Sequence, residues 1–323
     1  MTNYNDAQAG SYNSIFTAEG LSERQFVLDY GSSDALLVGE GTDFPFMFIE
    51  GLDETPEIRT FDTPRASAHG LTSGTDWYGE RVIRLGLGVV GEFGSSEYRE
   101  KLDLLKKSSF ARTGDIDVLY RFNNTEARLI HYRPRRMRVE TDPETYALGL
   151  STVVLEMYCC DPFIYAPSET VISVPLGGGI DGSGNIATGI FGFGYNGSAA
   201  NSALAVNYGN AATYPIIRIT GSKDISLPKI WVEDRTPARK KSGDLINSTA
   251  SIQYLATLGQ QQVLTLNHQN HTVVVNGASG YSKITAQSKF WGLSPGENRI
   301  SFTSFNPQNL TGSCTVTYRS AWI

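Results

Sequence analysis

Apolar residues along most of this chain follow the alternating or continuous patterns that are typical of β-strands. The longest such run in the first half covers residues 81–90, which are rich in β-branched and aliphatic side chains. It follows a turn-prone segment at residues 72–76, and it contains glycines, which often mark a bulge or a close backbone approach. We therefore predict a long, bulged hairpin arm at residues 79–91. Further strands are predicted at residues 116–122, 127–132 and 149–158.

One segment has the period of an α-helix instead. Tyr98, Leu102 and Leu105 lie at positions i, i+4 and i+7, so they would form a single apolar stripe. Two serines can cap its start, acidic residues occupy its first turn and lysines its last turn. The pattern predicts one helix over residues 95–109.

The second half consists of short β-prone segments separated by turn residues, which is typical of a β-sandwich. The predicted strands cover residues 214–220, 229–232, 252–255, 263–266, 273–275, 299–302 and 314–318. A segment rich in Gly, Asn and Ser at residues 176–213 precedes them. The chain is thus predicted to be mainly β, with one domain at residues 1–165 and a β-sandwich domain at residues 166–323.

Composition narrows the class of protein. With 27 Lys and Arg against 33 Asp and Glu, the net charge of −6 argues against a general basic surface for nucleic acid. Only 19% of residues are charged, so we expect neighbouring proteins to cover part of the surface. Three cysteines do not make a disulfide framework, which favours a reducing compartment. Neither a signal peptide nor an apolar run of about 18 residues is visible, so we expect no membrane span.

Residues with catalytic or metal-binding potential do not form a recognisable motif. His268 and His271 have the spacing of a metal pair, but they lie in a predicted hairpin loop without a third ligand nearby. We interpret both as solvated loop histidines. No nucleophile elbow, phosphate-binding loop or distinct carboxylate pair appears. The sequence therefore predicts no enzyme activity, no metal and no cofactor.

Five arginines lie close together at residues 128–138. One interpretation is electrostatic contact with nucleic acid or with an acidic partner. The other is a pair of strands whose arginines are solvated or lie between subunits, where carboxylates would be available. The sequence leaves both open and favours the second.

Three groups of segments have a characteristic order and spacing. The first joins residues 79–87 to 98–105, and the second contains Asp161-Pro162-x-x-Tyr165 within residues 159–165. The third group covers residues 206–221, 290–300 and 316–322. Together they resemble the siphophage distal tail protein family, a component of the tail tip or baseplate hub. The chain departs from that pattern in the Gly-rich stretch 177–210 and in the polar segment before Gly31.

The resemblance implies a structural virion protein. Members of the family form a hexameric ring at the distal end of a long non-contractile tail, leaving a lumen through which DNA passes without specific binding. The N-terminal domain would form the ring, and the C-terminal domain would be a galectin-like β-sandwich. Implied partners are further copies of the chain, the tail tube protein, the tail hub protein and a receptor-binding protein or host glycan. The implied location is the virion, after assembly in the host cytoplasm.

Two sets of residues follow from this resemblance. The residues expected at the inter-subunit interface are Arg81, Ile83, Leu85, Leu87, Tyr98, Leu102 and Leu105. We expect aspartate at 83 and 85 to leave folded monomers that fail to assemble. The structural signature residues are Asp161, Pro162, Tyr165, Asn207, Gly209, Pro215, Trp291, Pro295, Gly296 and Asn298. Their residue types suit strand ends, turns and core contacts, with Gly296 at the positive-φ position of a type II turn.

An alternative function is a carbohydrate-binding adhesion module that contacts the host envelope. It would reside in the C-terminal domain, and it is compatible with a ring protein that carries such a module.

Overall fold

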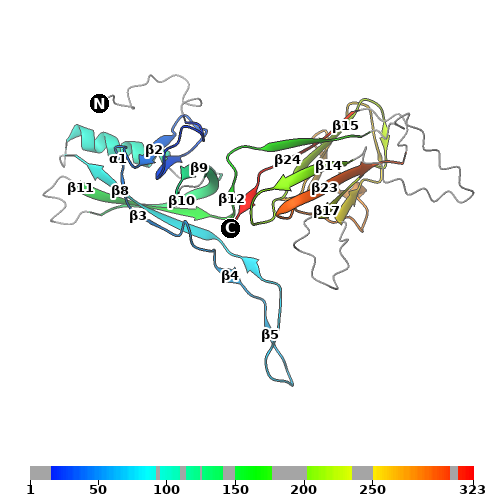
Figure 1. The fold of residues 1–323 in the computed structure, drawn as a ribbon, viewed down its shortest axis with the longest axis horizontal. Coiled ribbons are helices and arrows are strands. Elements are labelled where there is room, and N and C mark those ends of the chain that lie inside the picture. Colours follow the sequence, from blue (N-terminus) through cyan, green and yellow to red (C-terminus); the bar gives the residue numbers. More distant parts are fainter. Residues whose placement is uncertain are drawn as a thin grey trace, which may run out of the picture. The chain divides into compact units, whose positions relative to one another are not determined.

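The computed structural model of the chain describes residues 16–91, 95–109, 114–123, 126–140, 150–176, 202–234, 250–305 and 312–323. The chain forms two compact units, and the division between them falls at Pro167 and Ser168. The fold is mainly β, as predicted (Figure 1). Most of the Gly-rich stretch 177–210 lies outside the described residues.

An antiparallel sheet in the order β2-β1-β9-β10-β11-β8-β3 organises the first unit, and a short strand, β12, also pairs with β10. These strands are β1 (Gln25–Leu28), β2 (Leu36–Gly39), β3 (Phe46–Glu50), β8 (Arg81–Val90), β9 (Ile116–Arg121), β10 (Arg128–Glu140), β11 (Leu150–Cys159) and β12 (Ile164–Tyr165).

Strand β10 joins the two halves of this sheet. Its first part, up to Tyr132, pairs with β9, and its second part, from Arg133, pairs with β11. The register shifts between Pro134 and Arg136, and Pro134 has no N–H to donate to a ladder. The bulge therefore lies just beyond the point where β10 changes partner.

The helix α1 (Ser96–Ser108) matches the sequence prediction. The Ser95 side chain caps it by accepting a hydrogen bond from the Tyr98 backbone N–H at 3.1 Å. Its apolar face packs on β8 and β2, and the Tyr98 hydroxyl lies 2.8 Å from the buried Ser151 hydroxyl. The helix therefore covers one face of the sheet.

Strand β8 supplies the centre of this core, which corrects the predicted interface. The side chains of Ile83, Leu85 and Leu87 are fully buried within the unit, whereas Val82 and Arg84 on the other face are exposed. A side chain enclosed by its own subunit cannot contact a neighbour. Ile83, Leu85 and Leu87 are therefore core residues, and only the exposed face of residues 79–91, with Val82 and Arg84, is free to meet a neighbour.

The second unit is the predicted β-sandwich. One sheet has the order β13-β24-β15-β20-β21-β22, and the other has the order β14-β23-β17-β18. Side chains such as Ile217, Leu264, Ile300 and Phe302 fill the space between them and are 0–1% exposed. The strands are β13 (Thr170–Val174), β14 (Ser202–Asn207), β15 (Ile216–Gly221), β17 (Lys229–Asp234), β18 (Ala250–Gln253), β20 (Val263–Asn267), β21 (Thr272–Val275), β22 (Ala278–Ser279), β23 (Gly296–Thr303) and β24 (Gly312–Tyr318). The shorter elements are β16 (Ile225–Ser226), β19 (Thr257–Leu258), β25 (Ala321–Trp322) and a 3₁₀ turn at Tyr281–Lys283.

Replacing Ile83 with Asp should unfold the first unit instead of releasing folded monomers. A carboxylate at this fully buried position would lose its hydration without gaining a partner, at a cost of about 4 kcal/mol or more. Urea unfolding followed by near-ultraviolet circular dichroism measures the effect. Val82→Asp is the matched control, because the neighbouring Val82 is 38% exposed and should tolerate the change. Equal stability of the two variants would contradict the assignment of β8 to the core.

Candidate functional site

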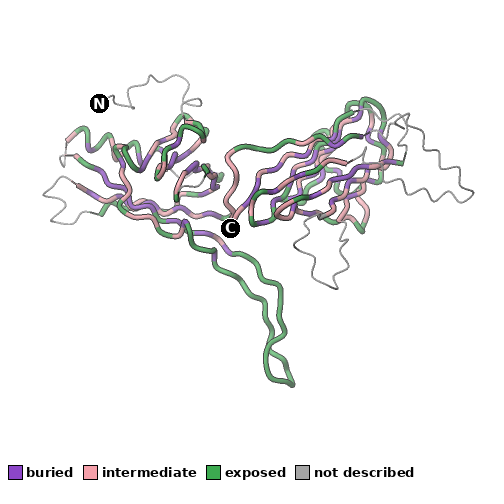
Figure 2. Tube along the Cα trace, viewed as in Figure 1, coloured by how far each residue is buried: buried purple, intermediate pink, exposed green. Residues whose placement is uncertain are grey.

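A two-stranded arm connects β3 to β8, and every residue from 57 to 78 in it is exposed (Figure 2). Its outgoing and returning halves pair as β4 (Ile58–Arg59) with β7 (Trp77–Tyr78), and as β5 (Thr63–Pro64) with β6 (Leu71–Thr72). Figure 1 shows the arm leaving the body of the first unit. A two-stranded ribbon with neither face covered is only marginally stable in water, so contact with a partner would stabilise this arm.

The arm also carries large apolar side chains that nothing covers. The exposed fractions of these side chains range from 46% for Tyr78 to 62% for Phe61. The full set is Ile58, Phe61, Leu71, Trp77 and Tyr78. Exposed apolar residues that gather on one element, rather than lying scattered, are typical of protein–protein contact surfaces.

Arg81 fixes the base of the arm. This side chain is 3% exposed, and its Nη1 donates to the carbonyl oxygens of Leu52 at 2.9 Å and Glu54 at 2.6 Å. Its Nε donates to the carbonyl oxygen of Pro162 at 3.0 Å. Burial lowers the pKa of the Arg81 guanidinium from its ordinary value. One guanidinium thus ties the outgoing half of the arm to the segment that ends the first unit.

The Asp161-Pro162-x-x-Tyr165 signature forms the other side of this contact. Asp161 accepts hydrogen bonds from the Phe163 backbone N–H at 3.1 Å and from the Tyr165 hydroxyl at 2.7 Å. This bonding holds the turn in which the Pro162 carbonyl faces Arg81. The signature residues of the first unit are therefore structural, as their types indicated, and they act together with Arg81.

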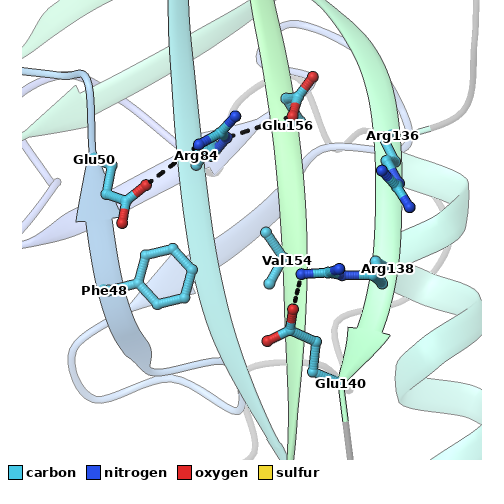
Figure 3. Close-up of a pocket in the computed structure, with 8 residues that line it drawn as sticks. All are labelled: Phe48, Glu50, Arg84, Arg136, Arg138, Glu140, Val154 and Glu156. Atoms are coloured by element: carbon cyan, nitrogen blue, oxygen red, sulfur yellow. Dashed lines mark hydrogen bonds and ion pairs between the residues drawn. The ribbon is translucent and has the colours of Figure 1, made fainter.

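A groove of about 390 Å³ lies on the sheet face opposite the helix (Figure 3). The strand register places Glu50, Arg84 and Glu156 side by side on β3, β8 and β11, and Arg84 forms ion pairs with both carboxylates. The register continues this row with Arg136 on β10, opposite Glu156, and places Phe48, Val154 and Arg138 together in the next row, with Glu140 beyond it. With three arginines and three glutamates, this face is charge-balanced.

The remaining arginines of β10 have separate roles. Arg133 pairs with Asp115, and the Arg135 guanidinium lies 4.6 Å from the centre of the Tyr158 ring. Arg138 pairs with Glu140, whereas Arg136 has no ion pair among the described residues. The stretch is thus partly neutralised within the chain, which fits the interpretation that it is a strand with solvated or inter-subunit arginines.

The other predicted interface residues lie mostly in the core. Tyr98 and Leu105 of the helix are 7% and 1% exposed, and Leu102 packs at the edge of the same cluster. Their side chains are therefore largely unavailable to a neighbour. The arm residues were missed because their strands are two residues long and lie among Thr, Ser, Gly and Pro, which resemble a turn. Phe61 and Trp77 in such a polar segment were the one signal that sequence reasoning could have used.

The signature residues of the second unit fasten its loops. Asn207 is 1% exposed, and its amide donates to the carbonyl oxygens of Ala211 at 2.7 Å and Leu293 at 3.1 Å. Gly209 is required because a Cβ there would overlap the carbonyl of Ala321. Asn298 bonds in the same way to Ser294 and to the backbone of Gly296, which has the positive φ of 94° expected in its turn.

His268 corrects the interpretation of the loop histidines, since its side chain is 0% exposed. Its Nδ1 accepts a hydrogen bond from the Trp291 backbone N–H at 3.0 Å, and its ring lies 4.1 Å from the Trp291 ring. Its own backbone N–H donates to the carbonyl of Pro215 at 3.2 Å. Burial lowers the pKa of His268 to about 3, so the ring is neutral. The polar residues around it in the sequence gave no sign of this burial, whereas His271 is exposed as expected.

Within the described ranges, no group of three His, Cys, Asp or Glu side chains could hold one metal ion. No helix in this part of the chain is long and apolar enough to cross a membrane. Two exposed surfaces of the described residues stand out, namely the arm and the charged sheet face.

Comparison with known proteins gives this arrangement a context. Residues 208–322 match the family model of the siphovirus-type tail component, C-terminal domain. The second unit is thus similar to this tail-component domain. The predicted resemblance to the distal tail protein family is confirmed, because the chain also has the fold of the Dit protein of phage SPP1. That protein is described as a paradigm of the hub adsorption apparatus in phages that infect Gram-positive bacteria.

The structural match to SPP1 Dit covers 93% of this chain and 99% of that chain, with a TM-score of 0.61. The sequence identity is 16%, so this likeness concerns the fold. A chain of the phage P2 baseplate in its activated conformation with Ca is 13% identical over 92% of this chain and 98% of that chain. Its TM-score is 0.44, too low to support an argument. No curated protein sequence is similar enough to count as a relative.

Arg81→Ala should destabilise the first unit strongly. The change would leave the buried carbonyls of Leu52 and Pro162 without this donor. The free energy of unfolding should fall by about 2–4 kcal/mol in total. Urea unfolding measures this difference. The control is Arg84→Ala. The Arg84 side chain is 54% exposed, so its removal should lower the free energy of unfolding by less than about 1 kcal/mol. A small effect of Arg81→Ala would show that the arm's base is held by other contacts.

Acid should weaken the second unit through His268. The unfolded chain binds a proton near the ordinary pKa of 6.5, whereas the folded ring does so only near 3. Stability contributed by the neutral ring is therefore fully present above pH 6.5 and decreases as the pH falls toward 3. Between pH 7 and pH 5 the expected loss is about 2 kcal/mol in urea unfolding.

Two variants separate His268 from other titrating groups. His268→Gln should lose this part of the pH dependence, and His271→Gln should keep it because His271 is exposed. The same pH dependence in wild type and His268→Gln would mean that other groups cause it.

Proposed function

We propose that this protein is a phage tail component that forms a closed ring, with six copies as the family resemblance implies, at the distal end of a long non-contractile tail. The ring would join the tail tube protein to the hub and receptor-binding apparatus. Its lumen would let DNA pass without sequence-specific binding. The first unit would form the ring, and the second unit would be available to further tail-tip proteins. We expect no catalytic turnover.

The exposed arm is the observation that supports a ring most directly. In a cyclic assembly, each subunit offers one surface and receives a different one from its neighbour. The arm at residues 57–78 offers charged side chains and large apolar ones that stay 46–62% exposed within their own chain. An element of this kind has a clear role in an assembly and none in an isolated subunit.

Negative-stain electron microscopy combined with light scattering tests the ring. Wild-type protein should give particles with a central hole and a mass close to six subunits. Replacing Phe61 and Trp77 together with Ser should leave folded monomers, because both side chains are at least 60% exposed and contribute to no core. A wild-type protein that stays monomeric at high concentration, alone and with the tail tube protein, would contradict the ring.

The matched control for this pair is Val171→Ser with Leu204→Ser. These side chains are 61% and 48% exposed, but they lie in the second unit. Their replacement should leave the rings intact. Equal loss of rings in both pairs would mean that exposed apolar residues act without regard to their position.

The carbohydrate-binding alternative has weaker support. His271, Phe290 and Tyr281 form a stack in which the outer rings lie 4.8 Å and 6.3 Å from Phe290. His271 and Tyr281 thus each stack on Phe290, so part of this aromatic surface is used within the chain, whereas a sugar platform needs open ring faces. Saturable binding of host-envelope glycans to the intact protein would restore this alternative.

A further inference from the structure

Three large apolar side chains lie at one end of the four-stranded sheet of the second unit. Phe305 follows β23 and is 80% exposed, and Leu255 follows β18 and is 53% exposed. Leu227 precedes β17, the strand between these two, and is half-buried. The Phe305 N–H donates to the carbonyl of the residue before Leu227, and the residue after Leu227 accepts from the N–H next to Leu255, both at 2.9 Å. The three residues therefore form one feature, the apolar tip.

The backbone of Leu227 is unusual for a leucine. Its φ is 49°, in the left-handed region, where a side chain is crowded and glycine or asparagine is favoured. The next residue is Pro228, and a residue before proline is further restricted to extended conformations. Among the described residues, the apolar cluster between the two sheets does not include Leu227. Neither the local backbone nor the core thus accounts for leucine here, and strained residues of this kind gather at functional surfaces.

The segments that form this end of the unit are basic. Four lysines and one aspartate, a net charge of +3 in a chain of net charge −6, lie in residues 223–229, 251–258, 281–289 and 301–305. The aspartate, Asp224, accepts a hydrogen bond from a backbone N–H at 2.9 Å. Lys229 comes just after Leu227, and the Lys283 carbonyl accepts from the Leu255 N–H at 2.6 Å. No described carboxylate forms an ion pair with any of the four lysines. The occupant of the tip should therefore carry negative charge beside apolar groups.

The size of the tip favours a membrane over a protein as its occupant. Three side chains of this kind bury at most about 600 Å² together, whereas a stable protein interface takes about 800 Å² from each partner. A bilayer has no such threshold, since each apolar side chain that enters its interface and each lysine near anionic headgroups adds to binding separately. The large exposure of Phe305 also suits a bilayer, which is entered rather than matched in shape.

We propose that the apolar tip inserts into the interface of a membrane with anionic headgroups, with the surrounding lysines at the level of the phosphates. Phe305 and Leu255 enter the acyl boundary, and Leu227 extends the apolar surface between them. Contact of this kind is peripheral and reversible, because few side chains take part and none crosses the bilayer. It adds a lipid partner to the tail-tip role proposed above and does not depend on ring formation.

Co-sedimentation with vesicles tests this contact. The full-length protein should bind vesicles of phosphatidylglycerol and phosphatidylcholine in equal parts at low salt, and vesicles of phosphatidylcholine alone at least about tenfold more weakly. Phe305→Ser with Leu255→Ser should reduce binding to the anionic vesicles at least about tenfold, because both apolar side chains are lost. Both positions are exposed, so the variant should fold, which circular dichroism checks. The matched control is Tyr208→Ser with Tyr214→Ser, whose side chains are 79% and 40% exposed near the other end of β23, and it should bind like the wild type.

A second pair of variants tests the charges. Lys229→Gln with Lys283→Gln should reduce binding to the anionic vesicles about tenfold and remove most of the preference for them. Lys106→Gln with Lys107→Gln removes two exposed lysines from the helix of the first unit, and this control should keep both the binding and the preference.

The outcomes separate insertion from other kinds of contact. A wild-type protein that does not bind the anionic vesicles at low salt would contradict the proposal. Loss of binding in the lysine variant alone would mean adsorption without insertion, and equal loss in the tyrosine control would mean that exposed rings act at any position. The proposal is also wrong if the Phe305 and Leu255 variant keeps its vesicle binding but loses a tail-tip protein, since the tip is then a protein contact.

Discussion

The contact between Arg81 and the backbone around it connects the parts of the first unit on which association depends. Arg81 begins β8, the strand whose alternate residues fill the core, and its guanidinium bonds to carbonyls at the start of the arm and to Pro162 at the end of the unit. Arginine suits this position because it spreads several donors over a planar group. A lysine would offer a single nitrogen to carbonyls that lie on different segments. The direction in which the arm leaves the sheet is thus fixed by a side chain that is itself part of the core strand.

Along each strand of this sheet, side chains alternate between the core and the surface. The residues that stabilise the fold are therefore different from those that could contact a partner. Odd-numbered residues of β8 and β11 enter the core, while even-numbered ones, such as Arg84 and Glu156, form the charged face. The charges on that face largely satisfy one another, so it presents no strong net attraction. The exposed arm has one ion pair at its base, between Arg59 and Glu80, and several large apolar side chains that stay at least 46% exposed. In the proposed ring, association would therefore be concentrated in this one element.

Much of the architecture was predictable because local signals agreed with the final packing. The helix was marked by its cap, its terminal charges and its apolar stripe, and the sandwich by short strands between turns. The candidate site was harder to predict. Ile83 and Leu85 were placed at an interface because an apolar strand with glycines resembles an arm, although the actual arm is polar and irregular. His268 was misjudged because burial of a loop depends on Trp291 and Pro215, which are distant in sequence. The sequence pattern contains no information about such long-range coverage.

The uncovered arm has a consequence for the order in which an assembly becomes stable. A ribbon held only by its own cross-strand bonds loses conformational freedom when it docks, and this entropy is subtracted from the affinity of every single contact. In a dimer or an open chain of subunits, at least one arm has no partner, so such a species would be short-lived. Closure changes this, because the last contact forms between subunits that are already linked, at a high effective concentration. Incomplete intermediates would then dissociate and return their subunits to the pool, whereas completed assemblies would persist.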